Sequence, residues 1–496
     1  MSEAEKNQTG RADGGSGNSG ESEGARQRIE KKRKSWAVWA LYLLALVLFT
    51  WIYVFLGAGL ILTQEEDARE RLQNPYLEAV YETAAMRERA RESGAAVTAR
   101  FTSWLPQYTD GIIDPLWPWL VQGFSDEPPE ELLRKGRWVN LFLCCGLIVL
   151  LGVAAARAFS FAGAAAMILM GGFGIILERS TYFTPDALYN LLVLIAWLCG
   201  LSLTRQNQLW IYGVFGVLLG LVYLARPPIW PILSAFLIVS LVRTVIDLVQ
   251  SRRGIEDRTL WVNSNQLVGL AIMVTAFLLV AGPRLSYAGA NFGQPLLSFS
   301  HYETWSDSAE EASRLFRRQA NPEAAETISW RQRPGPVRFI EENGAAALFE
   351  RAFEGAREQL RSSVLGRQGW IIFYGFFVFF AVAAIHRWAM WRKKDEIWKV
   401  RGASARWMLL FLVVGILLTL FHVGMGNPVV PSNAMTTALF LPILMTFVWI
   451  AERYRRQLQR SSVAPVVNFV YSGLMVLPIL WVTYRAFAAV RVALAG

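Results

Sequence analysis

The chain has 496 residues, of which 54% are hydrophobic and 18% are charged, and its formal net charge is +10. The charged share is below the roughly 25% typical of soluble domains, which argues against an ordinary soluble enzyme. Because the basic residues fall in short clusters beside apolar runs, they predict membrane orientation rather than nucleic-acid binding.

Apolar runs long enough to cross a bilayer recur along the chain. A membrane-crossing helix needs about 20 mostly apolar residues, whereas barrel strands alternate apolar and polar residues over about ten positions. Leu141–Ala156 and Trp407–Phe421 are apolar on every face. The sequence therefore predicts an all-α polytopic membrane protein with about 11 transmembrane helices and two long outer-face loops containing short helices.

Residues 1–35 are rich in Gly, Ser, Glu and Asn and have no apolar periodicity, so we expect a disordered cytoplasmic tail. The basic run Lys31–Lys34 precedes the first predicted span, 36–62. This span is too long for the apolar region of a cleaved signal peptide. It predicts a membrane anchor with the N-terminus inside.

Ten further spans complete the predicted bundle. They are expected near 138–156, 159–177, 186–203, 209–225, 228–243, 266–283, 368–386, 406–423, 434–451 and 464–487. With the N-terminus inside, every predicted cytoplasmic segment is net basic, which supports the alternation. Spans two to seven occupy 138–283, spans eight to eleven occupy 368–487, and an outer tail follows at 488–496.

Two long polar segments are predicted on the outer side, a first loop at 63–137 and a large loop at 284–367. Both contain helix-like stretches, so we expect folded loops that rest on the membrane. The three cysteines, Cys144, Cys145 and Cys199, lie inside predicted spans. They are interpreted as small core residues rather than as a disulfide framework or a thiolate metal site.

Carboxylates are expected to gather at the outer face. No carboxylate lies well within a predicted span, which disfavours a proton- or ion-coupled transporter. The outer acids are Glu65, Glu66, Asp67, Asp110, Asp114, Glu178 and Asp186.

Five local motifs carry a resemblance to a known family. They are Glu66-Asp67-Ala68, the segment Asp110–Pro118, Thr184-Pro-Asp-Ala-Leu-Tyr189, the segment Gly216–Pro227, and Asn291-Phe-Gly-Gln-Pro295 with Tyr302, Trp305 and Asp307 after it. In sequence and in order relative to the spans, they resemble motifs of the C-type glycosyltransferase superfamily, and within it the bacterial protein-mannosyltransferase-like group. The resemblance covers most of 36–450.

The resemblance implies an enzyme that takes a sugar from a polyprenyl-phosphate donor and transfers it, on the outer face, to a lipid, glycan or protein acceptor. Some relatives use a divalent metal, and the spacing of the acids here does not decide whether this chain does. No organelle signal is visible, and the one glycosylation sequon, Asn7-Gln-Thr9, lies in the inner tail. We therefore expect a bacterial inner membrane.

Sugar transfer needs a carboxylate that accepts the acceptor's proton and a cation that holds the departing phosphate, for which Arg is better suited than Lys. With the resemblance, this makes Asp67 the candidate catalytic residue, with Glu66 and Asp110 in reserve. Arg226 is the candidate phosphate-binding residue. The other candidate substrate-binding residues are Asp114, Tyr302 and Trp305.

Structural alternatives remain open for these residues. The acids at 65–67 could open an outer helix, where carboxylates suit the positive end of the dipole. Arg226 could extend to the membrane interface without binding a ligand, and Asp110 and Asp114 could be turn residues. The alternative functions are a transporter or flippase of lipid-linked glycans, and a non-catalytic membrane protein of the same fold.

Overall fold

The computed structural model describes residues 19–63, 74–92, 106, 112–158, 161–252, 259–306, 308–320, 334–365, 403–425, 462, 464–470 and 484. Throughout these residues the regular elements are helices, with no strand. The chain divides into two units, Met1–Trp51 and Ile52–Gly496.

Helix α1, Ser19–Thr63, starts within the segment that the sequence predicts as a disordered tail. The reason lies in residues 21–34, which are dominated by Glu, Arg, Lys, Gln and Ala, and these residue types favour helix. The apolar part of α1, Trp36–Leu62, coincides with the first predicted span.

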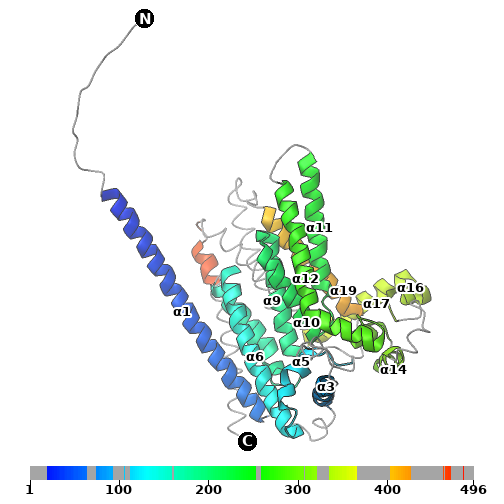
Figure 1. Cartoon of the computed structure of the whole chain (residues 1–496). Helices are drawn as coiled ribbons and strands as arrows, with labels where there is room; N and C mark the ends of the chain where they lie inside the picture. The colour runs from blue at the N-terminus through cyan, green and yellow to red at the C-terminus, as the bar shows by residue number, and fades with distance from the viewer. Residues whose placement is uncertain are drawn as a thin grey trace, which may run out of the picture. The chain divides into compact units, whose positions relative to one another are not determined.

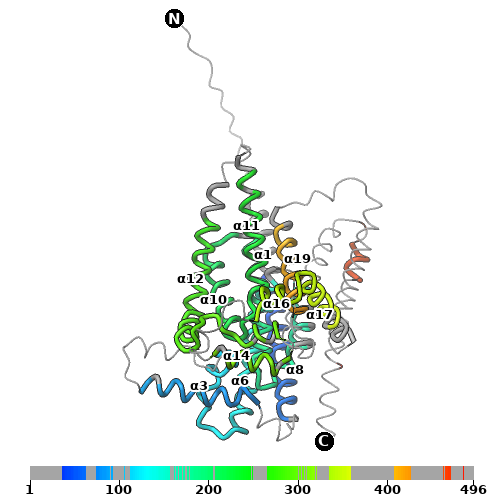
Figure 2. Tube along the Cα trace, turned by 90° about the vertical axis from the view of Figure 1, so that its right-hand side faces the viewer, coloured from blue at the N-terminus to red at the C-terminus, as the bar shows by residue number. Residues whose placement is uncertain are grey.

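The core of the second unit is built from long helices. They are α6 (Pro129–Ala158), α9 (Asp186–Gln206), α10 (Leu209–Ala225), α11 (Trp230–Arg252), α12 (Thr259–Phe292) and α19 (Ala403–Met425) (Figure 1). Between α6 and α9 lie α7 (Phe161–Met167), the π-helical segment η2 (Ile168–Ile176) and α8 (Leu177–Ser180). Helices α10 and α12 run side by side, as Figures 1 and 2 both show.

Five described helices are long and apolar enough to cross a membrane, judged by length and composition. They contain Trp36–Leu62, Pro129–Ala156, Asp186–Thr204, Asn265–Phe292 and Trp407–Met425. Two shorter apolar helices cover Leu209–Ala225 and Trp230–Ile246. These helices indicate an all-α membrane protein, as the sequence predicts. The spans predicted at 368–386 and 434–451, and most of that at 464–487, lie outside the described residues.

Glycines let neighbouring helices approach closely in this bundle. A Cβ atom on Gly216 of α10 would collide with the backbone carbonyl of Met273, and one on Gly220 would collide with Val280, both on α12. On α19, a Cβ atom on Gly415 would enter the ring of Trp197 of α9. Small residues at such positions are typical of helix contacts in membranes, where packing rather than hydrophobicity holds helices together.

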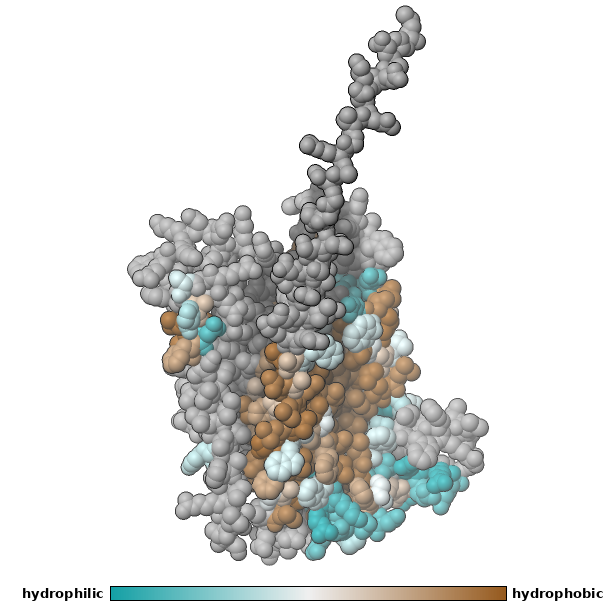
Figure 3. All heavy atoms as spheres, turned by 90° about the vertical axis from the view of Figure 1, so that its left-hand side faces the viewer, coloured by the Kyte–Doolittle hydropathy of each residue, from teal (hydrophilic) through white to brown (hydrophobic). Residues whose placement is uncertain are grey.

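Large apolar side chains are exposed on several of the long helices. Leu150 on α6, Leu267 and Leu279 on α12 are 59%, 66% and 74% exposed. Figure 3 shows one face of the molecule, where hydrophobic side chains gather in a broad band with hydrophilic side chains below it. Water would make so large an apolar surface unfavourable, whereas lipid is as apolar as the side chains themselves.

Shorter helices lie in the segments predicted as loops. The first segment contains α3 (Pro75–Glu92), α5 (Leu116–Val121) and the 3-10 turn η1 (Gln122–Phe124). The second contains α13 (Phe299–Trp305), α14 (Ala309–Ala320), α16 (Pro336–Asn343) and α17 (Ala345–Leu365). Helix α12 continues through Pro283 to Phe292, so the start of the predicted large loop is helical. The cysteines are free thiols, with Cys144 and Cys145 buried in α6 and Cys199 partly buried in α9.

Candidate functional site

Arg226 lies at the end of α10, where two prolines follow it. A residue before proline is forced out of helical geometry, and Arg226 has the extended values φ −160° and ψ 132°. Its backbone N–H still donates to the Val222 carbonyl at 2.8 Å. The helix therefore stops at Arg226, and the guanidinium is carried at the end of the bundle, here called the Arg226 end.

Asp186 is the first residue of α9, where a carboxylate suits the helix dipole. The loop before it is fixed from α6, because Asn140 Nδ2 donates to the carbonyls of Tyr182 at 3.2 Å and Thr184 at 3.1 Å. Phe183 in the same loop packs edge-on against Trp117, with ring centroids 5.6 Å apart. These contacts fix the backbone from which Asp186 projects.

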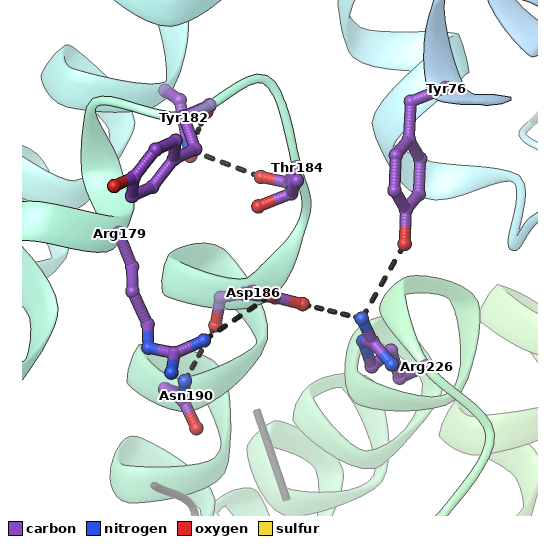
Figure 4. A network of polar contacts seen from close by, with 8 residues as sticks. Tyr76, Arg179, Tyr182, Thr184, Asp186, Asn190 and Arg226 are labelled. Atoms are coloured by element: carbon purple, nitrogen blue, oxygen red, sulfur yellow. Dashed lines mark hydrogen bonds and ion pairs between the residues drawn. The ribbon is translucent and has the colours of Figure 1, made fainter. Parts of the chain in front are cut away.

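Asp186 joins two arginines at the Arg226 end. Arg226 Nη2 donates to Asp186 Oδ1 at 2.5 Å, and Arg179 Nη1 donates to Asp186 Oδ2 at 3.5 Å. Figure 4 shows the carboxylate between the two guanidinium groups, with Tyr76 approaching Arg226 from the other side. The Arg226 and Asp186 side chains are only 22% and 17% exposed, so this ion pair is less screened than a surface pair.

Tyr76 reaches Arg226 from α3, whose first turn is capped. Asn74 Oδ1 accepts the Tyr76 backbone N–H at 3.0 Å, which is the usual way in which Asn begins a helix. The Tyr76 hydroxyl then accepts a hydrogen bond from Arg226 Nη2 at 3.4 Å. A buried apolar group holds α3 against α5 and α6, made of Leu77, Val80, Trp117, Val121, Leu132, Leu133 and Phe183.

The surroundings of Arg226 keep it a cation. Burial acts to lower the pKa of its guanidinium, but Tyr76, Asp186 and Asp114 together raise that pKa above its usual value. Its Nε is buried and has no hydrogen-bond partner within the described part of the chain. Arg226 therefore retains one N–H donor, on Nε, that no described residue satisfies.

Of the other sequence-predicted residues, Asp114 acts electrostatically on Arg226 and helps to raise the pKa of its guanidinium. Two residues before Asp114, Ile112 packs against a second apolar group, here called the loop cluster, made of Leu297, Tyr302, Ala312 and Phe316. The short segment 112–114 thus packs against the second long segment through Ile112 and acts electrostatically on Arg226 through Asp114.

Tyr302 and Trp305 lie in aromatic contacts of α13. Tyr302 is 3% exposed and its ring centroid is 5.4 Å from that of Phe316, so its ring belongs to the loop cluster. The Trp305 ring lies 6.1 Å from Phe339 of α16. The candidate catalytic residues Asp67, Glu66 and Asp110 lie outside the described residues.

Three residues of the network were absent from the predicted site, namely Asp186, Arg179 and Tyr76. Asp186 had a usable signal, because Thr184-Pro-Asp places a carboxylate at the start of an apolar span. Tyr76 had no such signal in the sequence, since it lies 150 residues from Arg226 in the chain.

The arrangement is suited to binding an anion beside an apolar bundle. Arginine's planar fork matches the oxygens of phosphate, and the neighbouring acids and phenol fix its orientation. Within the described residues, no group of three His, Cys, Asp or Glu side chains is placed to hold a metal ion.

No protein-family model matches the chain, and no curated protein matches it significantly. The case for a function therefore comes from the site's chemistry and from the motifs in the sequence.

Proposed function

We propose that the chain is a membrane glycosyltransferase that moves a sugar from a polyprenyl-phosphate donor to a lipid, glycan or protein acceptor on the outer face. The observation that supports this most is the partly buried Arg226–Asp186 pair at the end of a bundle of apolar helices. A lipid tail can lie against apolar helix surfaces while its phosphate reaches Arg226. A soluble sugar donor would need a cation for its phosphate but no apolar helix surface beside that cation.

In this proposal Arg226 stabilises the negative charge that develops on the departing phosphate. Asp186 and Tyr76 orient its guanidinium. Asp67 accepts the proton of the acceptor hydroxyl, with Glu66 or Asp110 as the alternative base. Asp114, which acts electrostatically on Arg226, contributes to substrate binding in this proposal.

The proposal extends to the membrane arrangement. We propose eleven spans, a cytoplasmic N-terminus and a bacterial inner membrane, which together place the Arg226 end on the outer face. The apolar helices and the basic segments between predicted spans support this orientation.

The test is transfer from a radiolabelled lipid-linked sugar by membranes that contain the full chain. We expect Arg226→Gln to lower the rate about 100-fold, the usual cost of removing one donor to a developing negative charge, and Asp67→Asn to lower it at least as much. Arg226→Lys should retain more of the rate than Arg226→Gln, because lysine keeps the positive charge although it lacks the planar guanidinium that pairs with two phosphate oxygens. The matched control is Arg134→Gln, which removes an exposed arginine paired with Glu131.

Two results would reject the proposal. If Arg226→Gln and Asp67→Asn transfer sugar at the unaltered rate, the site is wrong. If the unaltered chain consumes no lipid-linked sugar, the assignment as a glycosyltransferase is wrong. Movement of the intact lipid between leaflets would then identify a flippase.

A further inference from the structure

Asn190 lies one turn into α9 from Asp186, and its side chain is 0% exposed. Its Nδ2 donates to the backbone carbonyl of Asp186 at 2.8 Å. Because the amide oxygen cannot donate to a carbonyl, this bond fixes which way the amide is turned. Asn190 Oδ1 then faces the interior as a buried acceptor, with no hydrogen-bond partner in the described parts of the chain.

His422 is a buried residue near the end of α19, 7% exposed. The indole N–H of Trp230 donates to His422 Nδ1 at 2.9 Å. An indole nitrogen only donates, so Nδ1 must be unprotonated and the ring proton must be on Nε2. His422 Nε2 is therefore a buried donor, and it too has no hydrogen-bond partner among the residues described.

Helix register places the two residues, Asn190 and His422, at the same level of the bundle. Gly200 of α9 lies against Phe411 of α19, and Trp197 lies against Gly415, so the two helices run in opposite directions. Continuing by helical turns toward the Arg226 end brings position 190 opposite position 422.

A second set of contacts agrees with this register. The hydroxyl of Tyr189, next to Asn190, donates to the Pro228 carbonyl at 3.3 Å. Two residues later, Trp230 holds His422. The start of α11 therefore contacts both Tyr189, the neighbour of Asn190 on α9, and His422 on α19.

Burying a polar atom without a partner is unfavourable, and such atoms are uncommon in folded proteins. Here there are two of opposite kinds, an acceptor and a donor, on facing helices beside the Arg226–Asp186 pair. A hydroxyl group satisfies both at once, because it accepts from Nε2–H and donates to Oδ1. A phosphate does not, since its oxygens would face the Asn190 oxygen with no proton between them.

We infer that Asn190 Oδ1 and His422 Nε2 together bind one sugar hydroxyl of the lipid-linked donor. This inference rests on the proposed function and divides the donor between two sets of residues. Arg226 takes the phosphate, and the uncharged pair takes the sugar.

The test compares binding of farnesyl phosphate with binding of the same lipid phosphate carrying mannose, glucose or galactose. The full chain is held in phosphatidylcholine nanodiscs, which contain no sugar. We expect at least one sugar to increase the affinity of the unaltered chain. Asn190→Leu should reduce that increase about fivefold, as expected for one neutral hydrogen bond, and leave the farnesyl phosphate affinity unchanged.

His422→Phe is made together with Trp230→Phe so that no indole N–H loses its acceptor, and we expect the same selective loss. Thr419→Val is the matched control on α19, because the Thr419 hydroxyl already donates to the Gly415 carbonyl at 2.7 Å. It should leave the sugar-dependent increase unchanged. Because Asn190→Leu also removes the Nδ2 bond to the Asp186 carbonyl, the melting temperature of the ligand-free protein is measured beside the affinities, and a general loss of stability would weaken both lipids rather than only the sugar-bearing one.

The inference is overturned if no sugar increases the affinity of the unaltered chain. It is also overturned if Asn190→Leu weakens the sugar-free and sugar-bearing lipids equally. A different result separates it from the proposed function. If Arg226→Gln binds farnesyl phosphate normally while the increase from the sugar still needs Asn190, the phosphate site fails and the hydroxyl site stands.

Discussion

Asp186 shows what a sequence can and cannot predict about a site. Arg226 was recognisable from the run that ends at Arg226-Pro227, and an outer carboxylate was expected to face it. Among the described residues, the carboxylate that pairs with it is Asp186, 40 residues earlier, whereas the candidates Glu66 and Asp67 lie outside the described residues. Which of several acids meets one arginine depends on helix packing, and the order of residues does not contain that information.

The Arg226–Asp186 pair should contribute measurably to stability. Asp186→Asn leaves a partly buried arginine without its charged acceptor, so we expect a loss of about 2 kcal/mol in the free energy of unfolding. The measurement is thermal or denaturant unfolding of the purified protein in detergent. The exposed pair of Arg134 and Glu131 serves for comparison, and Arg134→Gln should cost less than about 1 kcal/mol.

A double-mutant cycle separates the pair from its surroundings. Arg226→Met, Asp186→Leu and the double variant should show a coupling of about 1 to 2 kcal/mol. Additive effects of the two changes would mean that the pair contributes nothing of its own.

At the level of helices, the lengths of the apolar runs predicted well where α10 begins and ends, but the effect of a proline inside a helix was predicted less well. The span predicted at 209–225 has the same limits as α10, because polar residues and two prolines bound it. The span predicted at 266–283 ended at Pro283, since proline lacks the N–H that a helix interior uses. The structure continues α12 to Phe292, because losing one hydrogen bond does not stop a helix whose end is packed: the Tyr287 hydroxyl lies 3.5 Å from Met86 Sδ, and Phe292 packs against the loop cluster.

The contact between α10 and α12 should depend on Gly216. Replacing it with valine forces side-chain atoms into the Met273 carbonyl, so we expect a loss of about 1 to 3 kcal/mol and a lower melting temperature. Gly146→Val on α6 is the control, since nothing lies within 4 Å of its added Cβ. Equal melting temperatures for the two variants would contradict the packing described here.

Helix α17 should be held to α19 by a second glycine contact. Gly355 and Gly424 approach so closely that a Cβ on either would meet the other helix's backbone. We expect Gly424→Val to release α17 and to increase trypsin cleavage after Arg351 and Arg357 several-fold, measured by mass spectrometry of the folded protein. Gly344, just before α17, is not a suitable control position. Its φ of +83° disfavours any side chain, so Gly344→Ala would destabilise the protein without changing the contact between α17 and α19.

For the whole molecule, the sequence predicted a polytopic helical membrane protein, and the five long apolar helices support that class. It did not predict which helices are neighbours. Helix α10 packs along α12 more extensively than along α11, its successor in the chain. The reason is that Gly216 and Gly220 create a close-packing face, and a single sequence does not name the helix that meets it.

The proposed orientation predicts which residues face the outside of the cell. In right-side-out vesicles, an impermeant maleimide should label Asn343→Cys, on α16, without detergent. It should label Gln208→Cys, between α9 and α10, only after the membrane is opened. The native cysteines are replaced by serine to remove background, and a reversed labelling pattern would invert the topology.

The placement of Asp186 has a consequence for how a donor could leave. Its carboxylate already uses the Arg226 Nη2 donor, so under the proposed function the phosphate of the donor would compete with a resident anion for that nitrogen. A hydrogen bond from Nη2 to the phosphate of the proposed donor would be partly offset by the one that Asp186 gives up. Such competition weakens binding without removing it, and a spent carrier can depart as the internal carboxylate returns to its arginine.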